Sequence, residues 1–514
     1  MAFVVTHNQY VMDRGGKVFK QSAPVIKLPE GATEDGHLAL LAVLNGSTAC
    51  FWLKQVSQSK GGSGIGRGIQ DEEWENRYEF TSTKLEKYPL PQTLPLEFGQ
   101  ELDSLAHQLA AVEPMAVCAS GVPTGEHLDA AREEHERIRS RMIALQEELD
   151  WDVYHRYGLI ADDEAAELVA APGSVPDISL GERAFEIVMA RRMKANELET
   201  QWFARHRSTP VTEIPEDWPE AYRTVVAKRI EFSERNRNIG LIERPEYKRR
   251  WLSATWEDKQ AGALRTWLLD RCEERSLWYG LDEQPRAMTV NRLADLLRSD
   301  ADVVSVARLY AGQNAELFEV LNEIIADEHV PFLAVYRYKG EGLLKRTLWE
   351  LTWEKQREED RTGERLDIEV PPKYTSADFW KTSYWRHRGK LDVRKERFIS
   401  YPGASPGSDQ SLLLGWAGWD HREQALVLTT LIEQRSTVDG WDSEQLTPLL
   451  AGLAEVMPWV RQWHGKIDPA FGQSPADALD AYLTYQTESR SLTEQALRTW
   501  SPPPPARRGP GRTG

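Results

Sequence analysis

A heptad seam between Leu128 and Leu149 is the feature that most constrains the fold of this chain. Apolar or small side chains recur there at alternating steps of three and four residues, and Glu and Arg flank them. Such spacing predicts one long helix that packs a narrow apolar stripe against a partner helix. Pro123 marks its start, because proline is favoured in a first helical turn. His135 interrupts the stripe, and we interpret it as a tolerated core residue rather than a ligand.

Helix and strand patterns alternate upstream of the seam. Residues 37–54 and 96–112 show helical spacing of their apolar side chains, whereas residues 78–83 are strand-like. Glycine and serine dominate residues 57–68, which indicates a loop. Residues 1–95 are therefore predicted to form a mixed α/β unit, with helix after it.

The pattern downstream of the seam is mostly helical. Residues 161–180 are first acidic and then small and Pro/Gly-bearing, which is typical of a linker. Four further segments follow: a helical extension (181–330), a small α+β region with basic and aromatic residues (331–414), a Trp-rich acidic helical region (415–500) and a disordered tail (501–514). The predicted fold class is α+β and predominantly helical.

Composition excludes several classes of protein. The 514 residues include 63 Lys and Arg against 80 Asp and Glu, a formal net charge of −17, which argues against coating DNA by bulk charge. No run of about 18 apolar residues occurs, so we expect no contact with a membrane. Three cysteines (Cys50, Cys118 and Cys272) stand far apart and without ligand spacing to His. That usage excludes a disulfide scaffold or a zinc ribbon and makes the cytoplasm the default compartment.

The sequence shows no signature of a catalytic or metal site. The glycines of residues 61–68 lack GxGxxG spacing and follow a helix-like stretch, so we favour a flexible, DNA-facing loop over cofactor binding. No GK[ST], GxSxG, HExxH or HxH motif stands out, and the glutamates within residues 350–359 form a solvated helix face with Lys355 and Arg357. We therefore predict no catalytic, cofactor-binding or metal-binding residue in this chain.

Residues 373–400 are locally basic and aromatic. They contain eight Lys and Arg against three acidic residues, with six aromatic side chains interleaved. Guanidinium groups pair with phosphates and aromatic faces stack on unstacked bases, so this pattern is compatible with nucleic-acid binding. It is equally compatible with a core-facing aromatic stripe that carries ordinary solvated charges, and both interpretations stay open.

Short motifs spread over nearly the whole chain carry a family resemblance. They are LLAVLNGS at 40–47, YEFT at 78–81 with YPLP at 88–91, ELDWDVYHRYG at 148–158, GLIERPEYKRRW at 240–251 and SYWRHRGKLDVRKERF at 383–398. In these motifs the chain resembles the carboxyl-terminal part of the adenine-specific DNA methyltransferases of the phage growth limitation or bacteriophage exclusion (BREX) type.

The resemblance implies a function for each part. Residues 1–115 would be the C-terminal portion of a DNA target-recognition domain, residues 116–160 the heptad helix that closes it, and the remainder the long extension of these methyltransferases. Together with the basic patches it leads us to predict these DNA contacts: Lys54, Lys60, Arg67, Lys84, Arg386, Arg388 and Lys390.

The chain also departs from the family pattern. The catalytic half of these methyltransferases binds S-adenosylmethionine and holds the flipped adenine with an Asn-Pro-Pro-Tyr-type motif. No such motif occurs here, and the nearest prolines, Pro371 and Pro372, stand in Val-Pro-Pro-Lys. We therefore expect a fragment that is inactive alone, with S-adenosylmethionine bound by a catalytic domain absent from this chain.

Two functions follow as hypotheses. In the first, the chain is the DNA-recognition and docking portion of an adenine-specific (N6) methyltransferase of a phage-defence system. Its partners are double-stranded DNA, the catalytic half and other defence proteins. In the second, it is an interaction or scaffold component without DNA binding. A complete enzyme with an unfamiliar active site is a third alternative, and it requires methyl transfer by this chain alone.

Overall fold

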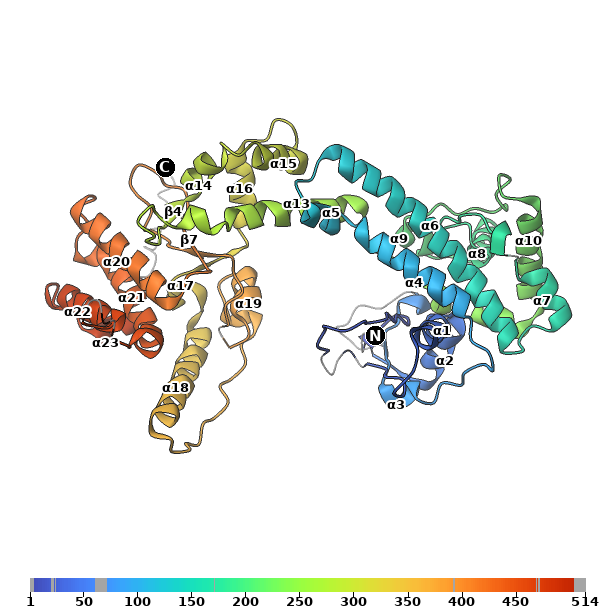
Figure 1. Cartoon of the computed structure of the whole chain (residues 1–514), viewed down its shortest axis with the longest axis horizontal. Coiled ribbons are helices and arrows are strands. Elements are labelled where there is room, and N and C mark those ends of the chain that lie inside the picture. Colours follow the sequence, from blue (N-terminus) through green and yellow to red (C-terminus); the bar gives the residue numbers. More distant parts are fainter. Residues whose placement is uncertain are drawn as a thin grey trace, which may run out of the picture. The chain divides into compact units, whose positions relative to one another are not determined.

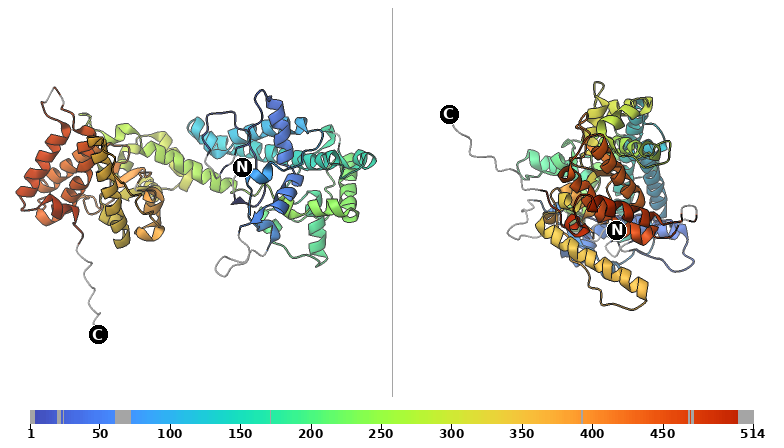
Figure 2. Two further views of the ribbon diagram at one scale, coloured as in Figure 1. Left: turned by 90° about the horizontal axis from the view of Figure 1, so that it is seen from below. Right: turned by 90° about the vertical axis from the view of Figure 1, so that its left-hand side faces the viewer.

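The computed structural model describes residues 4–19, 23, 25–60, 72–170, 172–391, 393–467, 469 and 472–502. Helices make up most of these residues and the strands form small sheets (Figures 1 and 2), so the predominantly helical α+β class is confirmed. The chain divides into two compact units, unit 1 (Met1–Gln260) and unit 2 (Ala261–Gly514).

Unit 1 combines helices with a three-stranded antiparallel sheet of order β1-β3-β2. The strands are β1 (Val4–Val5), β2 (Gln58–Ser59) and β3 (Tyr78–Glu79). The helices are α1 (Glu34–Leu44), α2 (Ser47–Val56), α3 (Ser82–Leu85), α4 (Leu96–Ala111), α5 (Pro114–Ser120), α6 (Gly125–Arg156), α7 (Asp162–Leu168), α8 (Ala184–Lys194), α9 (Trp202–His206), α10 (Glu220–Arg235), α11 (Arg237–Ile242) and α12 (Pro245–Lys248). Helix α13 (Trp256–Cys272) begins in this unit and ends in unit 2.

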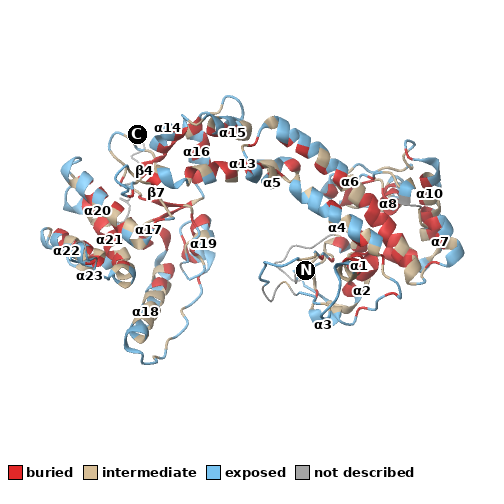
Figure 3. Ribbon diagram, viewed as in Figure 1, coloured by how far each residue is buried: buried red, intermediate tan, exposed pale blue. Residues whose placement is uncertain are grey.

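The heptad seam forms the long helix α6, which spans 32 residues. Thr124 caps its start by accepting a hydrogen bond from the backbone N–H of His127 at 3.2 Å. Ile138 and Leu145 of the seam pack with Leu105 of α4, so the stripe is buried inside unit 1. Toward its C-terminal end α6 is buried on more sides (Figure 3), and charged residues are buried there as well as apolar ones.

The single helix expected over residues 37–54 is instead two helices, α1 and α2. The break falls at Asn45 and Gly46, a pair that favours turns, and Asp150 of α6 fixes the start of α2. The backbone N–H of Ser47 donates to Asp150 Oδ1 at 2.7 Å, and the Ser47 hydroxyl donates to Oδ2 at 2.6 Å. A carboxylate is favourable at a helix N-terminus.

Among the described residues no single helix is long and apolar enough to cross a membrane, and α1 and α2, bent by 67°, meet that criterion only as a pair.

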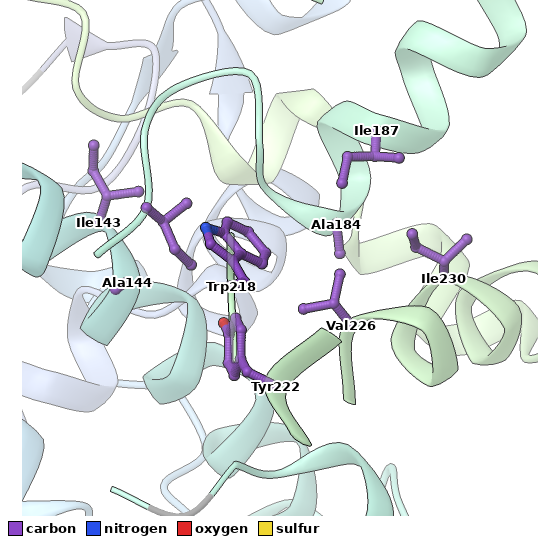
Figure 4. Close-up of a cluster of buried hydrophobic side chains, with 9 residues drawn as sticks. Ile143, Ala144, Ala184, Ile187, Trp218, Tyr222, Val226 and Ile230 are labelled. Carbon is purple, nitrogen blue, oxygen red and sulfur yellow. The ribbon is translucent and has the colours of Figure 1, made fainter. Parts of the chain in front are cut away.

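Residues 161–180, which by composition are typical of a linker, contain α7 and pack on the body of unit 1. Their acidic residues lie in the first turn of α7, where the helix dipole favours negative charge. Ile178 is 2% exposed and belongs to a cluster that joins α6, α8 and α10 (Figure 4). The other members of this cluster are Ile143, Ala144, Ala184, Ile187, Trp218, Tyr222, Val226 and Ile230.

Unit 2 is built around a four-stranded sheet of order β4-β7-β6-β5, in which only the β5–β6 pair is parallel. The strands are β4 (Met288–Thr289), β5 (His329–Pro331), β6 (Phe398–Ser400) and β7 (Leu413–Trp416). The helices are α14 (Val290–Leu297), α15 (Ala301–Ala311), α16 (Leu317–Ile325), α17 (Ala334–Arg337), α18 (Gly340–Thr362), α19 (Thr382–Arg388), α20 (His421–Thr437), α21 (Ser443–His464), α22 (Pro475–Glu488) and α23 (Glu494–Arg498).

Asp409 connects β4 and the start of α14 to the segment before β7. Its carboxylate accepts hydrogen bonds from the hydroxyl of Thr289, from Asn291 Nδ2 at 2.9 Å and from the backbone N–H of Ser411 at 2.9 Å. Burial by itself raises the pKa of this carboxyl, but the hydrogen bonds outweigh it and lower the pKa to about 2.

We expect unit 2 to lose stability as the pH falls from about 4 to about 2. The folded pKa of Asp409, about 2, lies below the value of about 3.9 for an unfolded aspartate. The carboxylate therefore stabilises the fold above pH 4, and this contribution is lost as the pH falls through the folded pKa. Asp409→Asn should lower the melting temperature at pH 7 and flatten its pH dependence. Asp367→Asn, at an exposed position, is the control, and identical pH profiles for the two variants would contradict this assignment.

Candidate nucleic-acid interface

Two predicted DNA contacts, Lys60 and Lys84, lie beside the small sheet of unit 1. Lys60 directly follows β2, and its backbone N–H donates to the carbonyl oxygen of Arg77 at 2.7 Å. Its ammonium lies 2.5 Å from Glu79 Oε2, and its side chain is 48% exposed. Lys84 lies in α3, just after β3, and is exposed. An exposed ion pair contributes little to the stability of the fold. A phosphate can therefore replace Glu79 as the partner of Lys60.

Lys54 of α2 occupies a different environment, because its side chain is buried. Its ammonium donates to the carbonyl oxygen of Glu246 at 2.6 Å and lies 5.2 Å from the centre of the Tyr78 ring. Burial lowers the pKa of this ammonium. Lys54 thus links α2 to α12 inside unit 1, and a phosphate can reach it only if that contact opens.

Arg67 lies outside the described residues, as does the rest of the glycine loop at 61–68. The described chain stops at Lys60 and resumes at Glu72, beside the 3-10 turn Glu73–Glu75 that precedes β3. In chain order the loop therefore connects β2 to β3, the two paired strands next to Lys60.

The three predicted contacts in unit 2 differ in exposure. Arg386 is exposed and lies 3.2 Å from Asp327 Oδ2, and Lys390 is also exposed. Arg388 is buried and pairs with Glu396, whose Oε1 and Oε2 each accept from Arg388 Nε at 3.0 Å. Burial works to raise the pKa of Glu396, but the Arg388 guanidinium outweighs it and lowers that pKa. Arg386 and Lys390 are the two that face solvent.

The aromatic residues of the same segment divide between core and surface. Four of them are buried, namely Tyr374, Phe379, Tyr384 and Phe398. Trp380 and Trp385 are exposed, at 60% and 37%. The core-facing interpretation of this stripe therefore describes most of its rings, and only the two tryptophans are available to stack on a base.

A buried network of charges joins the motifs that carried the family resemblance, and sequence reasoning had not identified it. Lys248 is fully buried, and its ammonium contacts three carboxylates, those of Glu147 (3.0 Å), Asp150 (3.1 Å) and Glu243 (2.8 Å). Burial lowers the pKa of Lys248, but these carboxylates outweigh that and raise it. Burial raises the pKa of Glu147. The segments at 148–158 and 240–251 thus meet at one ion cluster.

The start of α2 is part of the same network. Asp150, which binds Ser47, also lies 3.6 Å from Arg250 Nη1, and Arg250 Nη2 donates to the carbonyl oxygen of Asn45 at 2.6 Å. A polar network of this kind fixes the relative position of the elements that contribute to it, since an unpaired buried charge is costly. The network around Lys248 holds α2 against α6 and α12. Because β2 and Lys60 follow α2 in the chain, it also fixes where they begin. Glu147 and Asp150 stand within the seam helix in the sequence, but their pairing with Lys248, 98 residues beyond Asp150, has no local sequence signal.

Within the described residues no group of three or more His, Cys, Asp or Glu side chains is arranged to hold a metal ion. The cysteines Cys50, Cys118 and Cys272 are buried and free. Burial raises the pKa of Cys118 and, most strongly, of Cys272, which keeps both thiols protonated at neutral pH.

Comparison with known proteins places the chain in a family. Residues 142–512 match the family model of a domain of unknown function, DUF7008. The chain belongs to this DUF7008 family. It is also 50% identical, over 99% of its length, to "Adenine-specific methyltransferase PglX" of Streptomyces coelicolor. The resemblance to the carboxyl-terminal part of the phage-growth-limitation methyltransferases is thereby confirmed. The chain spans 42% of the length of this curated relative. No solved structure matches it.

The DUF7008 match begins inside α6 and divides the candidate contacts into two sets. Arg386, Arg388 and Lys390 lie within the matched residues, whereas Lys60 and Lys84 precede them. The charges around Lys248 are inside the DUF7008 part, but Ser47, which Asp150 binds, is not. The buried network therefore attaches the DUF7008 part of unit 1 to the segment that carries the two exposed lysines.

Proposed function

We propose that this chain is the DNA-recognition and docking part of an adenine-specific (N6) DNA methyltransferase of a phage-defence system, acting in the cytoplasm. It acts together with a catalytic half that binds S-adenosylmethionine, and its partners are double-stranded DNA, that half and other defence proteins. The observation that carries the proposal is the 50% identity, over 99% of the chain, to an adenine-specific methyltransferase.

The described surface of unit 1 supports contact with DNA in this role. Lys60 and Lys84 are exposed beside one sheet, and the connection that contains Arg67 joins two strands of that sheet. Phosphate contacts of this kind position a protein on a duplex, while base contacts supply specificity. Because the net charge of the chain is −17, binding depends on these local cations.

Duplex binding by the whole chain tests this proposal. Fluorescence anisotropy with a pool of random-sequence duplexes of about 40 base pairs should show binding at about 50 mM salt. The logarithm of the affinity should fall with the logarithm of the salt concentration with a slope of about −2 or steeper, because each neutralised phosphate contributes about −0.9. Absent binding at 50 mM salt, or binding that does not change with salt, would contradict a phosphate-contacting surface.

An interaction role without DNA binding is the second candidate, and α18 supports it. Leu344, Leu348 and Leu351 recur at helical spacing along this helix and are 64%, 50% and 46% exposed. Exposed apolar side chains in one stripe are typical of a surface that a partner covers. This alternative predicts no duplex affinity at about 100 mM salt together with co-purification of a partner, and it predicts that Leu348→Glu abolishes the co-purification.

A further inference from the structure

Helix α18 is packed along one face and exposed along the opposite one (Figure 3). Gly342 and Arg346 are the two buried residues among its 23. Trp349 and Trp353 share their face at helical spacing, and their ring centres lie 6.0 and 5.5 Å from that of Trp459 of α21. Helices in folded proteins gain most of their stability from packing of an apolar face. The packed face of α18 is therefore the one that carries these tryptophans.

The opposite face of α18 carries a heptad stripe of its own. Leu344, Leu348 and Leu351 stand at steps of four and three residues and are 64%, 50% and 46% exposed. The same alternation leads back to Glu341 and on to Lys355, and both are exposed. Neither of these two side chains forms an ion pair with a described residue. The stripe is thus a short apolar seam with a carboxylate at one end and an ammonium at the other.

This stripe is complementary to itself when two copies of the helix run antiparallel. With a twofold axis at Leu348, that residue meets its own counterpart, and Leu344 of each copy meets Leu351 of the other. In the same register Glu341 of each copy lies opposite Lys355 of the other, so an ion pair closes each end of the seam. Parallel pairing would set Glu341 against Glu341 and Lys355 against Lys355. Charge therefore selects the antiparallel arrangement, because like charges in facing positions are destabilising.

We propose that α18 is a self-association site, through which two copies of this chain form an antiparallel dimer. Three leucines from each copy make a small contact, and stable interfaces bury about 1,200–2,000 Å². The dimer is therefore weak, with a dissociation constant on the order of 10–100 μM. At the concentrations of about 1 μM or less that a duplex titration uses, the chain is a monomer. The proposal deepens the interaction role of α18 and does not depend on DNA binding.

Sedimentation velocity of the whole chain between about 5 and 300 μM tests this proposal. The average mass is expected to rise with concentration from that of one chain toward that of two. Leu348→Glu places two carboxylates against each other at the twofold axis, and it should raise the dissociation constant by about tenfold or more. Leu281→Glu is the matched control, because Leu281 is a fully exposed leucine outside α18, and it should leave association within about twofold of wild type.

Charge reversal tests the register. Glu341→Lys and Lys355→Glu each turn both ion pairs of the dimer into pairs of like charge, and each should raise the dissociation constant about three- to tenfold. The double variant Glu341→Lys with Lys355→Glu restores opposite charges in exchanged order and should associate within about twofold of wild type. Because every substituted side chain is exposed, circular dichroism should show an unchanged fold for each variant.

Several results would overturn the proposal. One is a chain that stays monomeric at about 300 μM, and another is equal association of wild type and Leu348→Glu. A double charge variant that associates more weakly than either single variant would contradict the antiparallel register. If wild type stays monomeric but co-purifies another protein that Leu348→Glu loses, that protein covers the stripe. This last result would overturn self-association and leave the interaction role of α18 in place.

Discussion

Replacing Arg229 with methionine is expected to lower the free energy of unfolding of unit 1 by about 3–5 kcal/mol. Arg229 is 1% exposed, and its two terminal nitrogens donate to Glu148 at 2.7 and 2.6 Å. Its Nε donates to the carbonyl oxygen of Leu168 at 2.8 Å. The methionine fills a similar volume but leaves the Glu148 carboxylate buried without a cation, with the hydroxyl of Tyr222 and the backbone N–H of Ala170 as neutral donors. An uncompensated buried charge is the source of the loss.

Urea unfolding followed by circular dichroism measures this change. The control is Lys228→Met, at the neighbouring residue of α10. Because the ion pair of Lys228 with Glu167 is exposed, this change should lower the free energy of unfolding by less than about 1 kcal/mol. The double variant Arg229→Met with Glu148→Met removes both charges and should be more stable than Arg229→Met alone. A double variant that is less stable than the single one would show that the packing of Arg229, rather than its charge, is what matters.

The double variant Lys60→Ala with Lys84→Ala should bind duplex DNA about 100-fold more weakly than the wild-type chain at low salt. Each exposed lysine contributes about 1.4 kcal/mol through a charge-assisted contact with phosphate, which is about tenfold in affinity. The slope of affinity against salt should become shallower by about 2, one for each lost phosphate contact. Anisotropy with the same random-sequence duplexes measures both quantities.

A control for charge accompanies this measurement. Lys228→Ala with Lys355→Ala removes the same total charge from exposed positions of α10 and α18, which carry none of the predicted contacts, and it should leave the affinity within about twofold of wild type. Equal weakening by the two double variants would mean that overall charge rather than the surface beside β3 governs binding.

Because Lys54 is buried against Glu246, Lys54→Ala is expected to act on stability first, and it is a poor probe of DNA contact.

The sequence predicted the elements that local patterns determine. The heptad spacing identified α6 because a continuous apolar stripe requires a packed partner, and α4 supplies it. The Asn45-Gly46 pair is a local signal for the break between α1 and α2, but the contact of Ser47 with Asp150, 103 residues away, was not predictable in this way. The pattern of residues 331–338 is typical of a strand, yet β5 ends at Pro331, and Glu455 of α21 caps the short helix α17 by accepting from the backbone N–H of Ala334 at 3.0 Å.

For the candidate site, the positions of basic residues were predictable from the sequence, but the burial of their side chains was not. The family resemblance and residue type together led to Lys60 and Lys84, and both side chains are exposed. Residue type also identified Lys54 and Arg388, but contacts with Glu246 and Glu396 bury both side chains. Local charge counting cannot distinguish these two groups, because burial is decided by the partner that the fold brings to each side chain. The network around Lys248 was missed for the same reason.

Methylation by a chimera tests the central claim most directly. The part of the Streptomyces coelicolor relative that matches this chain is replaced by this chain, and N6-methyladenine in host DNA is mapped by sequencing. The same relative without that part is the reference. We expect methylation at defined sites by the chimera, strongly reduced methylation when Lys60 and Lys84 are alanine, and none by the truncated relative. Methylation of the same sites to the same extent by the truncated relative would contradict the claim that this chain recognises DNA for a methyltransferase.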